Sequence, residues 1–167
     1  MCIRDRQVMS IGSNFQESFQ KALCSMEEEL NGINSLAKNK EFASDEKIQS
    51  ELTIPGPKRL FYVADAIRKG WSLDKIHNHT KIDFWFLDQI EELINLENEL
   101  ENAGIKNLDK DKIIQIKEKG FSDNRIAELA RVDEDEIRAL RKEFNITPVY
   151  KRVDTVSYTH LTLPTTS

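Results

Sequence analysis

The sequence has few of the residues that disulfide frameworks, tight turns and metal sites require. Its 167 residues include 2 cysteines, 3 histidines, 6 glycines and 4 prolines. The two cysteines form no Cys-x-x-Cys pair and the histidines are scattered, which does not suit a structural zinc site and fits a reducing, cytoplasmic setting. So few glycines leave little material for β-hairpins or for a Gly-rich phosphate-binding loop. The composition therefore predicts a mainly α-helical chain.

Long apolar runs and an excess of positive charge are also missing. No stretch of about 18 apolar residues is present, and the N-terminus lacks the apolar core of a signal peptide. With 24 Lys+Arg against 29 Asp+Glu, the formal net charge is −5. A net acidic protein exerts no general attraction on phosphates. We therefore expect no membrane partner and no nucleic-acid partner.

The two ends of the chain differ in character from its middle. Residues 1–6 have no recognisable period, and residues 156–167 are rich in threonine without turn or capping signals. Both stretches resemble translated adapter sequence at the ends of metagenomic reading frames. We interpret them as sequencing artefacts and leave them out of the fold prediction. On this interpretation the chain is an internal piece of a longer protein.

The first part of the remaining chain predicts a short extended run and then a helix. Val8 to Ile11 form a β-type run that Gly12 closes, and Asn14 with Glu17 has the spacing of a capping box. Apolar residues then recur at helical spacing, which predicts one buried stripe. The stripe consists of Phe15, Phe19, Ala22, Leu23, Met26 and Leu30.

The middle of the chain repeats itself. Residues 69–72 (Lys-Gly-Trp-Ser) recur as residues 119–122 (Lys-Gly-Phe-Ser). Each copy predicts a helix that ends at its glycine, then a short helix, and then a turn before Asp83 or Asp133, which caps a longer helix. We therefore expect a compact helical module with two tandem helix-turn-helix-like units and short extended segments at both ends. We also expect each copy to cover the apolar face of the other.

The second copy resembles a DNA-binding helix-turn-helix in its local pattern. Its longer helix begins with four acids, from Asp133 to Glu136, where a recognition helix approaches phosphates. The acids suit the helix dipole and oppose a duplex, whereas Arg138, Arg141 and Lys142 lie further along. A stand-alone helical adaptor or a nucleic-acid-binding module is therefore the alternative function.

The other histidine, cysteine and glutamate side chains indicate no catalytic or metal site. His77 and His79 are two residues apart, so on a helix they diverge and do not chelate one ion. Cys24 has no base near it in sequence and is expected to be a buried or bystander thiol. Nothing around Glu91 and Glu92 would desolvate them and tune a pKa. The sequence predicts no catalytic, cofactor-binding or metal residue.

Phe84 and Trp85 are surplus to the expected core. Six apolar residues after Asp83 already complete a stripe on that helix: Phe86, Leu87, Ile90, Leu93, Ile94 and Leu100. Aromatic anchors on the other faces are what a subunit contact needs. Two options stay open: an oligomer interface at Phe84 and Trp85, or packing of both rings under the helix that carries Tyr62.

Four runs of the sequence together carry a family likeness. They are residues 8–23, which include Asn-Phe-Gln-Glu-Ser-Phe-Gln-Lys-Ala-Leu, residues 59–66 (Arg-Leu-Phe-Tyr-Val-Ala-Asp-Ala), residues 82–93 (Ile-Asp-Phe-Trp-Phe-Leu-Asp-Gln-Ile-Glu-Glu-Leu) and residues 148–155 (Pro-Val-Tyr-Lys-Arg-Val-Asp-Thr). In this order they resemble the large chain of bacterial carbamoyl-phosphate synthase. The resemblance covers residues 7–155.

The resemblance implies the stretch between the two ATP-grasp halves of that enzyme. Residues 7–30 are then the C-terminal tail of the carboxyphosphate synthetic domain, residues 31–147 the helical oligomerisation domain, and residues 148–155 the start of the carbamoyl-phosphate synthetic domain. Cys24 replaces a residue that is usually basic in the family. Residues 28–54 match the family poorly, so the resemblance assigns them no role.

The family implies a ligase that makes carbamoyl phosphate from bicarbonate, glutamine-derived ammonia and two ATP, for arginine and pyrimidine synthesis. It also implies ATP with magnesium or manganese and potassium in the whole enzyme, a glutaminase small chain, flanking ATP-grasp domains, a homo-oligomer and a cytoplasmic location. The family's nucleotide and metal residues lie in the ATP-grasp halves. This segment is therefore expected to bind no cofactor, to be inactive alone, and to link the halves and mediate oligomerisation.

Overall fold

The computed structural model describes residues 8–26, 31–34, 44–105 and 108–148. The expectations for residues 1–6, 149–155 and 156–167 and for Leu30 lie outside this part of the chain. The described residues form helices α1 (Phe15–Cys24), α2 (Asp45–Thr53), α3 (Arg59–Arg68), α4 (Leu73–Thr80), α5 (Phe84–Ala103), α6 (Lys110–Glu118), α7 (Asp123–Ala130) and α8 (Glu134–Glu143). The prediction of a mainly α module is confirmed.

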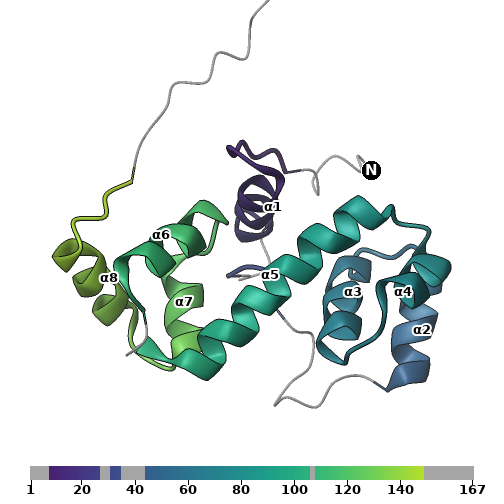
Figure 1. The fold of residues 1–167 in the computed structure, drawn as a ribbon. Coiled ribbons are helices and arrows are strands. Elements are labelled where there is room, and N and C mark those ends of the chain that lie inside the picture. The colour runs from purple at the N-terminus through teal and green to yellow at the C-terminus, as the bar shows by residue number, and fades with distance from the viewer. Residues whose placement is uncertain (1–7, 27–30, 35–43, 106–107, 149–167) are drawn as a thin grey trace, which may run out of the picture.

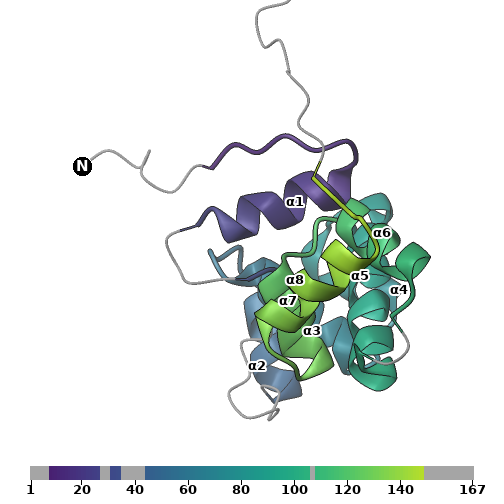
Figure 2. The ribbon, with the colours of Figure 1, turned by 90° about the vertical axis from the view of Figure 1, so that its left-hand side faces the viewer.

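Helix α5 is the long element of the fold and runs between two groups of shorter helices. Figure 1 shows α2, α3 and α4 on one side of it and α6, α7 and α8 on the other. Helix α1 crosses α5 on the outside of the body, as Figures 1 and 2 both show. Helices α3, α4 and α5 form the first copy of the repeat and α6, α7 and α8 the second, whereas α2 packs beside the first copy.

The duplication extends to the caps of the short helices. Ser72 caps α4 and Ser122 caps α7, and each serine side chain accepts a hydrogen bond from the backbone N–H three residues later. The same helices end at Lys81 and Arg131, both in the left-handed conformation with φ 58°. Two such matches, at equivalent places, confirm the tandem units that the sequence predicts.

The two copies do not cover each other, so that expectation is wrong. Each copy has its own core around one part of α5: Leu87 and Ile90 lie in the core of the first copy, and Leu96 and Leu100 in that of the second. The physical reason is the length of α5, which has 20 residues where its counterpart α8 has 10. One helix of that length serves both units, which sit side by side along it.

The first described segment lies outside the helices, as expected of the predicted short extended run, but it does not form a β-strand. Residues 8–11 form no strand, and Val8, Met9 and Ile11 are exposed. A strand needs a partner to satisfy its backbone groups, and the described part of the chain is otherwise helical, with no strand beside this run. The segment is extended without pairing.

The stripe predicted for α1 is only partly right. Asn14 caps the helix by accepting from the backbone N–H of Glu17, as expected. Of the predicted stripe Leu23 is buried, yet the other buried residues of α1 are Gln16 and Gln20. The face that α1 packs on the body is mixed: Leu23 lies in the core of the first copy and Phe19 packs against both cores. Gln16 and Gln20 lie on the same face, because the surface beneath them presents carboxylate and backbone carbonyl oxygens as acceptors.

Candidate functional site

The first turn of α5 exposes three consecutive aromatic side chains. Phe84 is 41%, Trp85 52% and Phe86 43% exposed. The Asp83 side chain accepts a hydrogen bond from the backbone N–H of Trp85 at 2.8 Å, which fixes the start of the helix. Phe86 was expected in the core, and that placement is wrong, because the core stripe begins only at Leu87, where the other helices first surround α5.

These rings form one surface with a ring from α1. Phe15 lies edge-on to Trp85 and to Phe86, with ring centroids 5.3 and 5.4 Å apart, and Trp85 and Phe86 are 5.0 Å apart. Edge-to-face pairs at such distances are favourable. We call Phe15, Phe84, Trp85 and Phe86 the aromatic surface.

Phe84 is held from the other side by α4. Its ring stacks on that of His77 with centroids 4.4 Å apart, and His77 Nδ1 lies 2.7 Å from the carbonyl oxygen of Ile82. The partners of the rings thus come from α1 and α4, whereas Tyr62 of α3 packs against the first core. About half of each aromatic side chain of this turn stays open to solvent, which is what an anchor for a protein contact requires.

The histidines and the cysteine do not assemble a reactive centre. The His77 ring faces Phe84, while His79 lies 6.3 Å from the ring of Trp71. Cys24 is exposed and free, and partial burial raises the pKa of its thiol, which makes it a weak nucleophile at neutral pH. In the described ranges no three His, Cys, Asp or Glu side chains gather into a group that fits a metal ion.

The two arginines of α8 pair with acids of the same copy. Arg138 pairs with Glu134 at 2.8 Å, and Arg141 pairs with Asp123. Burial raises the pKa of Asp123, but the bonds from Lys117 and Arg141 outweigh it and hold that pKa below its ordinary value. The helix therefore offers an acidic first turn and neutralised arginines to any polyanion.

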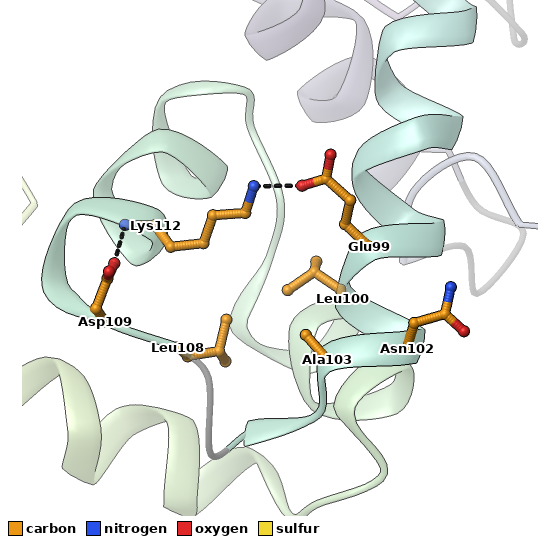
Figure 3. A pocket seen from close by; sticks show the side chains of 7 residues that line it. All are labelled: Glu99, Leu100, Asn102, Ala103, Leu108, Asp109 and Lys112. Carbon is orange, nitrogen blue, oxygen red and sulfur yellow. Dashed lines mark hydrogen bonds and ion pairs between the residues drawn. The ribbon is translucent and has the colours of Figure 1, made fainter.

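A cavity of about 490 Å³ lies between the end of α5 and the start of α6 (Figure 3). Lys112 bridges it by pairing with Glu99, and the Lys112 backbone N–H donates to the Asp109 carboxylate at 2.7 Å. The other lining residues are Leu100, Asn102, Ala103 and Leu108. The charged groups at this cavity pair with one another, so its lining offers no convergent set of groups for a reaction.

A buried ionic network joins the two copies, and sequence reasoning missed it. Glu97 of α5, 3% exposed, pairs with Arg68 of α3 at 2.6 Å and with Arg125 of α7 at 2.8 Å. Arg68 also pairs with the fully buried Asp65 at 3.0 Å. The signal was present in the sequence: Glu97 lies three residues after Ile94 and three before Leu100, a core position of the α5 stripe.

The described residues do not fit an ATP or divalent-metal site. They contain neither a glycine-rich phosphate loop nor a set of convergent carboxylates, and the one buried carboxylate pair, Asp65 and Glu97, is engaged by arginines. Among these same residues no helix has the length and apolar character that crossing a membrane requires.

Comparison with known proteins shows which family this chain resembles. Carbamoyl phosphate synthase large chains from Haemophilus ducreyi and Vibrio cholerae are 47% and 48% identical to this chain over 149 residues. The aligned part is 89% of this chain and 13% and 14% of those relatives, so the chain spans about one seventh of their length. The family model described as the oligomerisation domain of the carbamoyl-phosphate synthetase large chain matches residues 7–145, and the chain belongs to that family.

Proposed function

We propose that this chain is the central part of a carbamoyl phosphate synthase large chain, which links two ATP-grasp halves and mediates self-association. The whole enzyme is then a cytoplasmic ligase that makes carbamoyl phosphate from bicarbonate, glutamine-derived ammonia and two ATP, with a glutaminase small chain as partner. ATP, magnesium or manganese, and potassium belong to the flanking halves in this proposal, since the family has its nucleotide and metal residues there. The segment alone is inactive in this proposal.

The proposed division of the chain follows the family likeness. Residues 7–30 end the carboxyphosphate half, residues 31–147 form the oligomerisation domain, and residues 148–155 begin the carbamoyl-phosphate half.

The observation that carries the oligomerisation role is the aromatic surface. Three aromatic side chains in one helical turn remain 41–52% exposed beside a fourth ring from α1. Exposed Lys81 lies before this turn, and exposed Asp83 and Asp88 lie at its start and after it. A contact related by a twofold axis brings the same patch of both subunits together, so charges of both signs around an apolar centre suit a second copy of this chain.

The nucleic-acid alternative has weaker support. A recognition helix needs free basic groups near its first turn. In α8 this turn holds Glu134, Asp135 and Glu136, and Arg138 is bound to two of these acids. A duplex meets net negative charge there.

Sedimentation velocity of Trp85→Glu tests the proposed function. The change places a charge at the centre of the aromatic surface, and we expect the oligomer distribution to shift to monomer. Ile54→Glu is the matched control, because Ile54 is 69% exposed after α2 and receives the same charge. Retained oligomers in Trp85→Glu with intact helicity contradict the proposed interface, as does equal dissociation of both variants.

A further inference from the structure

We propose that α1 is a separable part of the self-association surface, so that the chain associates with a second copy only while α1 is docked on α5. This inference rests on the proposed function and adds a condition to it. Three observations support it. The rings of the aromatic surface come from two helices, buried glutamines of α1 bind acceptors on the body, and the backbone of α1 lies close to Gly120.

The aromatic surface is built from two elements that are distant in sequence. Trp85 and Phe86 come from α5, whereas Phe15, which lies edge-on to both, comes from α1. Phe15 also stacks on Phe19 of the same helix at 5.4 Å. When α1 leaves, two of the three α5 rings lose their shared neighbour, and the patch presented to a second copy becomes smaller and looser.

Both apolar and polar side chains hold α1 on the body: Leu23 lies in the core of the first copy and Phe19 packs against both cores, while two glutamines supply buried polar contacts. The buried Gln16 donates through Nε2 to Glu92 Oε2 at 2.5 Å, and to the Gln89 carbonyl at 3.4 Å. The buried Gln20 donates to the Lys119 carbonyl at 3.4 Å, while its Oε1 has no partner. The net contribution of such hydrogen bonds to stability is small, and a buried acceptor without a partner lowers stability. A helix with such contacts belongs to the part of a structure that opens most readily.

The backbone of α1 lies close to Gly120. A Cβ built there would lie 2.8 Å from Glu17 Cα and 3.1 Å from the Glu17 carbonyl oxygen, whereas one at Gly70 would meet nothing within 4 Å. These two glycines end equivalent helices of the repeat and have similar backbone angles, with φ 89° and 81°. The same substitution at both positions therefore imposes the same backbone strain, but only at Gly120 does it push against α1.

The proposed division of the chain connects the position of α1 to the preceding ATP-grasp half. Residues 7–30 end the preceding ATP-grasp half, so a movement of that half that lifts α1 also removes Phe15 from the aromatic surface. Self-association of the large chain is then coupled to the position of its first half, without a ligand at the interface itself.

The experiment compares Gly120→Ala with Gly70→Ala in the 167-residue chain carrying Trp71→Phe. This background leaves Trp85 as the one tryptophan, since the sequence has 2, and it copies the Phe121 found at the equivalent place of the second copy. Trp85 emission reports loss of Phe15, and light scattering over a dilution series reports the mass. We expect Gly120→Ala to shift Trp85 emission to the red and to raise the association midpoint about tenfold, and Gly70→Ala to change neither.

Gln16→Glu provides a second way to lift α1, because it sets a carboxylate against Glu92. The proposal is overturned if either variant exposes Trp85 while the association midpoint stays unchanged. It is also overturned if neither variant exposes Trp85, because α1 is then not separable. Trp85→Glu is measured in parallel. If the Trp85→Glu chain still associates, the proposed function is wrong. If it no longer associates, the proposed function stands whatever the glycine variants show.

Discussion

The carboxylate of Glu97 accepts two hydrogen bonds from the guanidinium of Arg125, at 2.9 Å from Nε and 2.8 Å from Nη2, both through Oε1. Its other oxygen accepts from Arg68 at 2.6 Å. Arg68 belongs to the first copy of the repeat and Arg125 to the second, and α5 carries Glu97 between them. One buried side chain thus holds both helical units on the shared helix.

We expect Glu97→Gln to lower the free energy of unfolding by about 3–5 kcal/mol, because it removes the buried charge that two guanidinium groups share. Urea unfolding followed by circular dichroism measures this change. The control is Glu128→Gln, since the Glu128 side chain also pairs with Arg125 but is 51% exposed, and it should cost about 0–1 kcal/mol. Similar losses in the two variants contradict the role of Glu97.

Glu17 predicts a pH dependence in the stability of the first turns of α1, because its partners Ser13 and Lys21 belong to the same segment. Bonds from Lys21 and Ser13 lower the pKa of Glu17 from 4.5 to about 2. Because the folded pKa lies below the unfolded one, the stabilisation is complete above about pH 4.5 and is lost as the pH falls towards 2. The difference in unfolding free energy between the unmodified chain and Glu17→Gln should therefore shrink by about half or more between pH 7 and pH 3. A difference that stays constant over this range is evidence against the Glu17 contacts.

The turn after α4 contains a position where glycine should improve stability. Lys81 ends α4 with φ 58°, and its backbone N–H donates to the His77 carbonyl. The left-handed conformation costs about 1–2 kcal/mol for a residue with a Cβ, and the greater freedom of glycine in the unfolded chain offsets about 0.5–1 kcal/mol of the gain. Lys81→Gly should thus raise the free energy of unfolding by about 0.5–1 kcal/mol.

Thermal and urea unfolding of Lys81→Gly and Lys81→Ala test this turn together. Alanine keeps the backbone penalty and removes the same charge, so it should change stability little. A gain in Lys81→Ala equal to that in Lys81→Gly would assign the effect to the charge.

The local features of the fold could be predicted from the sequence. Asn14, Ser72 and Asp83 cap helices because a cap is decided by a few neighbouring residues. The repeat was visible for the same reason, since its two glycines and its serine caps recur at fixed spacing. The family likeness rested on four short runs of the sequence, and the match of the family model to residues 7–145 confirmed it.

The tertiary features could not be predicted in the same way. Periodicity places Phe86 and Leu87 on the same helix, but only the packing of other helices decides that the core begins at Leu87. The burial of Gln16 depends on Glu92, 76 residues away. Phe84 and Trp85 were predicted to lie outside the core stripe, with exposure and packing under the Tyr62 helix both left open, and both side chains are exposed. Their role at an interface stays a prediction.

Incorporation of 5-fluorotryptophan and ¹⁹F NMR over a dilution series test the central claim most directly. The chain has 2 tryptophans, and Trp71, which lies against Lys75 in the first unit, serves as the internal control. We predict that the Trp85 resonance moves with concentration, with the same midpoint as the mass from light scattering, while the Trp71 resonance does not. Association that moves Trp71, or that leaves Trp85 unchanged, contradicts the assignment of this surface.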